Sequence, residues 1–182
     1  AKLLPQLDRA PNDEELLRLA QFPNEAGVGE ALKALLTNEK SRAAVAEKLL
    51  AQRTKLDAKQ IAPLLESAAR EMLAGVQALA DSGNDSERLK AGHQGALALQ
   101  LISGFQLTSL ESDLVALTRR GALQAPEAVE NRRSLLITLR DLRSAEADLF
   151  ASLAQSDPDA LTRDAALEAL PASRAPDAGT KP

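Results

Sequence analysis

The sequence predicts an all-α protein, in particular a right-handed α-solenoid of about four helical hairpins. Aromatic residues make up only 2% of the 182 residues, so that a core must be built from Leu and Ala, which favours helices over sheets. Apolar residues recur at helical spacing, and no strand-like alternation of useful length is present. A basic residue followed by a helix of small residues also recurs along the chain, which indicates stacked hairpins.

The clearest copy of this repeat lies in residues 157–170. Asp159 can cap the start of a helix, Pro158 suits the turn before it, and Arg163 lies one turn into the helix. Small or apolar residues then follow on one face: Ala165, Ala166, Ala169 and Leu170. The preceding apolar run has its own N-cap candidate in Ser144, so the unit is helix, short turn, helix.

Three earlier copies begin at Arg42, Lys90 and Arg132, at spacings of 48, 42 and 31 residues along the chain. The acidic turn, the arginine and the small-residue helix together resemble the HEAT-repeat (armadillo-like) family, over roughly residues 25–170. The resemblance implies stacked hairpins that present a concave face to a protein partner. It also implies that Arg132 bonds an acidic turn of the adjacent repeat.

The chain divides into an N-terminal lead-in and capping helix over 1–24, a repeat domain over 25–170 and a flexible tail or linker over 171–182, which is rich in Pro. Pro63 interrupts the helical pattern, so that we expect an irregular insertion at about 54–66. Caps and turn signals set the other boundaries. The expected helices cover residues 12–21, 24–37, 41–53, 67–80, 86–103, 108–121, 126–142, 144–155 and 158–170.

Composition narrows the possible functions. The absence of cysteine removes disulfides, thiolate metal sites and haem attachment through Cys-x-x-Cys-His. The net charge of −4 disfavours general attraction to nucleic acid, and no apolar run is long enough to span a membrane. Ala1 in place of an initiator Met suggests a processed or excised chain, and the compartment stays open.

The candidate catalytic groups have simpler explanations. His93 is the only histidine and has no cysteine near it, so we expect a structural or incidental role. The carboxylate pairs at 14–15 and at 157/159 lie at helix starts, where capping explains them. The sequence therefore predicts a non-enzyme with no metal and no cofactor.

Six arginines fall within 25 residues, in a segment of net charge +3. The strip consists of Arg119, Arg120, Arg132, Arg133, Arg140 and Arg143. The last four would share a helical arc of about 100° if one helix carried them all. Such a strip could bind an acidic peptide, phosphate groups or nucleic acid, but missing aromatic residues and the repeat pattern favour a solvated or inter-repeat role.

The favoured function is a non-catalytic scaffold or interaction module, part of a larger protein, whose partner is another protein or a neighbouring domain. A first alternative comes from a resemblance in style to the helical segment of planctomycete and verrucomicrobial membrane-bound dehydrogenase/c-type cytochrome proteins. It implies a helical spacer domain in an exported bacterial protein. A second alternative is nucleic-acid or phosphate binding through the arginine strip.

Overall fold

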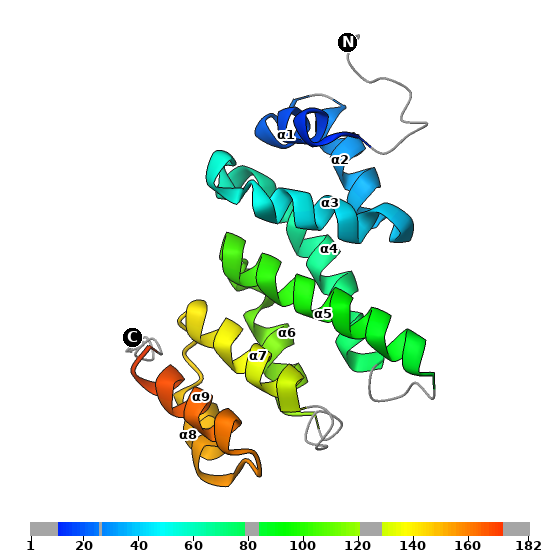
Figure 1. Cartoon of the computed structure of the whole chain (residues 1–182). Coiled ribbons are helices and arrows are strands. Elements are labelled where there is room, and N and C mark those ends of the chain that lie inside the picture. Colours follow the sequence, from blue (N-terminus) through cyan, green and yellow to red (C-terminus); the bar gives the residue numbers. More distant parts are fainter. Residues whose placement is uncertain (1–10, 26, 79–83, 121–128, 173–182) are drawn as a thin grey trace, which may run out of the picture.

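A computed structural model describes residues 11–25, 27–78, 84–120 and 129–172 of the chain. Within these ranges every regular element is a helix, which confirms the all-α prediction (Figure 1). The elements are α1 (Asp13–Gln21), α2 (Val28–Thr37), α3 (Glu39–Ala51), η1 (Arg53–Lys55), α4 (Ala58–Ala78), α5 (Asp85–Phe105), η2 (Thr108–Leu110), α6 (Glu111–Thr118), α7 (Val129–Asp141), α8 (Ala147–Ser156), α9 (Ala160–Ala169) and η5 (Leu170–Ala172).

Consecutive helices pack in pairs, α2 with α3, α4 with α5, α6 with α7 and α8 with α9. The second helices of these pairs form a row in which α3 contacts α5, α5 contacts α7 and α7 contacts α9 (Figure 1). At the N-terminal end α1 packs against both α2 and α3. Fully buried side chains from every pair form the core, including Leu36, Leu49, Leu65, Leu101, Leu114, Leu139 and Phe150.

The first helix begins where the sequence predicts. The Asn12 side chain accepts a hydrogen bond from the Glu15 backbone N–H, and the Asn12 N–H donates to the Glu15 carboxylate, both at 2.9 Å. This capping box satisfies two amide groups that the helix leaves free. Leu16 and Ala20 are then buried one turn apart, so that α1 covers the hairpin beside it.

The expected irregular insertion at 54–66 is wrong, because α4 begins at Ala58 and continues through Pro63. A proline inside a helix costs about 3 kcal/mol. Ile61 and Leu65, on either side of it, are both 0% exposed, and burying each contributes about 1.5–3 kcal/mol. Packing therefore outweighs the lost backbone bond, and only a short 3₁₀ turn and a connection precede the helix.

An arginine recurs at the same place near the start of four helices. Arg42, Arg88 and Arg163 each lie four residues after the N-cap of their helix, and Arg132 is the fourth described residue of α7. We call these four the repeat arginines. Counted from the N-cap, the residue of α5 that matches Arg42 and Arg163 is Arg88, two residues before Lys90, from which the sequence pattern places the second copy.

Two repeat arginines make the same contacts. Arg42 donates to the carbonyls of Leu36 and Thr37, at 2.9 and 2.8 Å. Arg163 donates to the carbonyls of Asp157 and Pro158, at 2.7 and 3.1 Å. In both hairpins these carbonyls lie six and five residues before the arginine, where the first helix ends without its own backbone donors. The arginine therefore closes the turn between the two helices.

Candidate functional site

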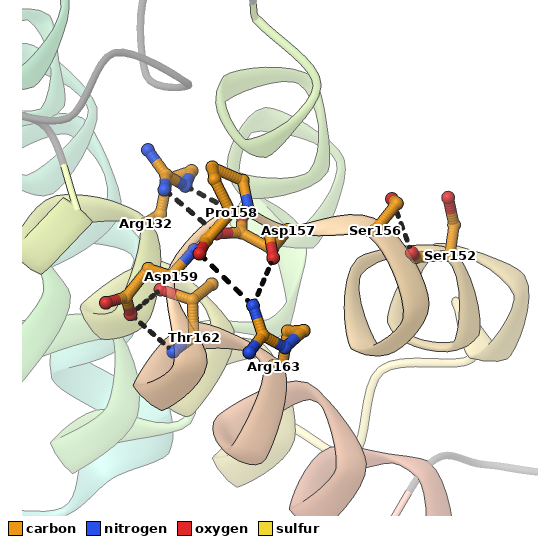
Figure 2. Close-up of polar contacts among 8 residues, drawn as sticks. All are labelled: Arg132, Ser152, Ser156, Asp157, Pro158, Asp159, Thr162 and Arg163. Carbon is orange, nitrogen blue, oxygen red and sulfur yellow. Dashed lines mark hydrogen bonds and ion pairs between the residues drawn. The ribbon is translucent and has the colours of Figure 1, made fainter.

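The arginine strip is not one exposed surface. The Arg132 side chain is 1% exposed and forms a two-point ion pair with Asp157, from Nε to Oδ2 at 2.9 Å and from Nη2 to Oδ1 at 3.0 Å. Asp157 is also 1% exposed, so both charges lie in the core (Figure 2). Arg132 thus cannot belong to a partner-binding strip. It joins α7 to the turn between α8 and α9. Arg132 therefore connects neighbouring hairpins, which the sequence analysis gave as the alternative to a binding strip.

Three further arginines of the strip have carboxylate partners. Arg119 pairs with Glu146 at 2.7 Å, Arg133 with Glu130 at 2.6 Å, and Arg140 with Glu168 at 3.0 Å. These pairs neutralise the charge that a polyanion would need.

Arg143, which was expected in the arc, and Arg120, which was not, lie away from the face of α7. Arg143 follows the end of α7 with a φ of 54°, so that it is not on the helical face assumed from the sequence. Arg120 is exposed just after α6, beside Arg119 and on a different helix from Arg132, Arg133 and Arg140. The six arginines therefore do not share one helical face.

The two aspartates of the last turn have different roles (Figure 2). Asp159 caps α9, because its Oδ2 accepts from the Thr162 N–H at 2.7 Å and from the Thr162 hydroxyl at 2.8 Å. These bonds hold the pKa of the Asp159 carboxyl below its ordinary value. Asp157 does not cap α9 as expected but pairs with Arg132 and accepts from the Asp159 N–H at 2.9 Å.

Ser144 is also not the N-cap of α8, where Glu146 lies instead. The serine is buried, and its hydroxyl donates to Glu111 Oε1 of α6 at 2.7 Å. Its polar group therefore ties the loop before α8 to the previous hairpin, a long-range contact that local sequence cannot indicate.

The Asp159 cap predicts a specific pH dependence for the variant Asp159→Asn. A carboxyl with a lowered folded pKa stabilises the fold fully above its unfolded value, 3.8, and this contribution disappears as the pH falls through the lower folded pKa. Asparagine keeps an acceptor oxygen but does not titrate. We expect the wild type to have the higher Tm at neutral pH and the difference to shrink below about pH 4. A Tm difference that is constant from neutral to acidic pH would contradict this role.

Polar contacts connect successive hairpins along the array. Lys90 of α5 pairs with Glu39 of α3 at 3.0 Å, and this hydrogen bond lowers the pKa of Glu39. Ser103 of α5 donates to Asp141 of α7 at 2.8 Å. In the row of first helices, Arg70 of α4 pairs with Asp113 of α6 at 3.0 Å. Many of the charged side chains along the array therefore connect its own hairpins to one another.

A groove lies on the face formed by α3, α5 and α7. Its volume is about 440 Å³. Small side chains form much of its lining, namely Ala96, Ser103, Gly104, Ser134 and Thr138. A side chain added at Gly104 would meet Leu50 of α3, so the two helices approach closely there. Sequence reasoning missed this groove because it depends on which faces of three separate helix pairs meet.

The groove combines apolar surface with one available charge. Ile137 of α7 is 37% exposed within it. Arg53 of η1 lies at its edge, exposed, with no carboxylate within ion-pair distance in the described part of the chain. Asp141, the acidic lining residue, is already bonded to Ser103 and Arg140. The free charge that the groove offers to a partner is therefore positive.

His93 and the carboxylates are the other candidates for acid–base or metal chemistry in the described ranges 11–25, 27–78, 84–120 and 129–172. His93 is exposed on α5, with its Nε2 atom 3.5 Å from Glu47 Oε1 of α3. No cluster of three or more His, Cys, Asp or Glu side chains is placed there to hold a metal ion. No helix in those ranges has the length and hydropathy needed to cross a membrane.

Comparison with known proteins gave no matching family model, no similar curated protein and no similar solved structure.

Proposed function

We propose that this chain is a HEAT-like helical-repeat module, a right-handed solenoid of about four hairpins, and that it binds a protein segment in the groove on α3, α5 and α7. The shared contacts of Arg42 and Arg163 support a repeat, since both arginines donate to the carbonyls six and five residues before them. The row of second helices supports the stack (Figure 1).

The groove carries this proposal because it spans three successive hairpins. Its small lining side chains leave room for the side chains of a bound segment, and exposed Ile137 offers apolar contact. Arg53 favours a carboxylate on the partner. The expected ligand is thus a segment with apolar side chains and at least one acidic residue, supplied by another protein or by a neighbouring domain.

The other two hypotheses have less support. The burial of Arg132 and the carboxylates on Arg119, Arg133 and Arg140 remove the argument for a nucleic-acid strip. The helical spacer of an exported dehydrogenase ranks second, because a spacer needs no binding site and so gives the groove no role.

A matched pair of exposed alanines tests the groove. Ala96 of α5 lines it and Ala44 of α3 does not, and both tolerate a longer side chain because both are exposed. We expect a partner captured from lysate of the source by the wild type to be retained by Ala44→Glu and lost by Ala96→Glu. The acidic substitution fills the groove and repels an acidic segment.

The same capture decides between a binding module and a spacer. Recovery of the same proteins by all three chains would place binding elsewhere. Absence of any specific partner would favour the spacer hypothesis.

A further inference from the structure

The face of α5 that lines the groove continues toward the start of this helix. Leu89 lies seven residues before Ala96, which places it two turns away on the same face. Leu89 is 76% exposed, more than any other large apolar residue in the described ranges. A second hollow of about 670 Å³ lies beside it, with Lys40 and Ala43 of α3 in its lining. The groove and this hollow therefore border one stretch of α5.

The accessible residues of this face form one line along α5, without Asp, Glu, Lys or Arg. They are Leu89, His93, Ala96, Gln100 and the half-buried Ser103. Their spacings alternate between four and three residues, which is the spacing of the seam along which two α-helices pack. From the first residue to the last, the line is about 21 Å long. We call these five residues the α5 seam.

Helices α3 and α5 run in the same direction beside this seam (Figure 1). At their N-terminal ends, Glu39 of α3 pairs with Lys90 of α5 at 3.0 Å. Near their C-terminal ends, Leu50 of α3 lies against Gly104 of α5. The partial negative charges of both helix C-termini therefore lie at one end of the seam, and the partial positive charges of both N-termini lie at the other.

Each end of the seam also has a cation without an ion-pair partner in the described ranges. Lys40 lies at the N-terminal end and Arg53 at the C-terminal end, and both are exposed. The carboxylate of Glu47, which lies between them, instead faces His93 Nε2 at 3.5 Å. The surface therefore favours an apolar segment with negative charge at both of its ends.

A helical segment suits the seam better than an extended one. An extended segment of that length has about six residues, and about half of its backbone C=O groups face the groove. The described lining offers few free donors for them. The Ser103 hydroxyl donates to Asp141 at 2.8 Å, and the Thr138 hydroxyl donates to a backbone carbonyl at 2.9 Å. A helix satisfies its own backbone groups, and its side chains at spacings of three and four match those of the seam.

We propose that the occupant of the groove is an amphipathic helix of about 15 residues that lies along the α5 seam, antiparallel to α5, with acidic residues in its first turn. In this direction its first turn meets Arg53, its C-terminal carbonyl groups meet Lys40, and its dipole opposes those of α3 and α5. Its apolar side chains cover Leu89 and pack on the small side chain of Ala96. The inference rests on the proposed function, since it names the conformation and direction of the segment bound in the same groove.

Random peptides of about 16 residues, displayed on phage, are the probe that tests this proposal. Peptides are selected on the wild-type chain, and those that still bind Ala96→Glu or fail to bind Ala44→Glu are removed. We expect the remainder to carry apolar residues at alternating spacings of three and four, with Asp or Glu near the N-terminus. Apolar residues at every second position would indicate an extended segment, which overturns the helix but keeps the groove. A selection without any peptide that depends on Ala96 would overturn both.

Leu89 distinguishes the full seam from the groove alone, because it does not line the groove. Leu89→Glu should weaken the binding of a selected peptide at least about tenfold, since it removes an apolar contact and adds a negative charge beside the C-terminal end of the peptide. Leu161→Glu is the matched control, because Leu161 is 57% exposed but lies on α9, and it should bind with wild-type affinity. Fluorescence anisotropy measures both affinities, and circular dichroism verifies that both variants remain helical. Wild-type affinity in Leu89→Glu would overturn the proposed seam.

The direction of the bound helix has its own test. A photo-crosslinker at the N-terminus of a selected peptide should label residues of η1, and one at its C-terminus should label the start of α5. Exchange of the two labelled sites would overturn the antiparallel direction.

Discussion

Replacing Asp157 by alanine is expected to lower the free energy of unfolding by about 3–5 kcal/mol, because it removes the two-point carboxylate contact from the guanidinium of Arg132, which lies in the core. Both side chains are 1% exposed, so that water cannot replace the lost partner. The substitution also removes the acceptor for the Asp159 N–H. Urea unfolding followed by far-UV circular dichroism measures the change directly.

Two control variants distinguish the effect of burying an ion pair from the effect of removing a charge. Glu14→Ala breaks the exposed pair with Arg18 and should change the free energy of unfolding by less than about 1 kcal/mol. The double variant Arg132→Met with Asp157→Leu removes both charges and should recover most of the stability lost in Asp157→Ala. If Asp157→Ala behaved like Glu14→Ala, the buried pair would not join the last two hairpins.

Local signals in the sequence located most of the helices. Asp159 caps α9 as the sequence predicts, and α1 covers the predicted residues with Asn12 as its cap, because each of these bonds joins residues three positions apart. Helix boundaries failed where tertiary packing overrides a local signal. Pro63 is such a case, since burial of Ile61 and Leu65 holds the helix through the proline.

The candidate site was harder to predict for a related reason. The charge of Arg132 is visible in the sequence, but its burial depends on Asp157, 25 residues away in another hairpin. The arc that residues occupy on one predicted helix cannot show a contact with a different hairpin. The groove likewise needs α3, α5 and α7 at their observed separations, and no local pattern encodes these separations.

Phe150→Ala is expected to reduce the free energy of unfolding by about 3–5 kcal/mol and to do so locally. The Phe150 side chain of α8 is 0% exposed in the last hairpin, so that its truncation leaves a cavity there. In a linear stack each hairpin is stabilised mainly by its neighbours. Native-state hydrogen exchange should therefore show faster exchange in α7, α8 and α9, while α2 and α3 keep their protection.

The same substitution in the middle of the array is the decisive comparison. Phe105 is the last residue of α5, in the second of the four helix pairs, and is 4% exposed. Its replacement by alanine should weaken protection on both sides, in α3 as well as in α7, because both helices contact α5. Identical exchange patterns for the two variants would mean that the chain opens as one cooperative unit. That result would contradict the nearest-neighbour stack on which the proposed solenoid depends.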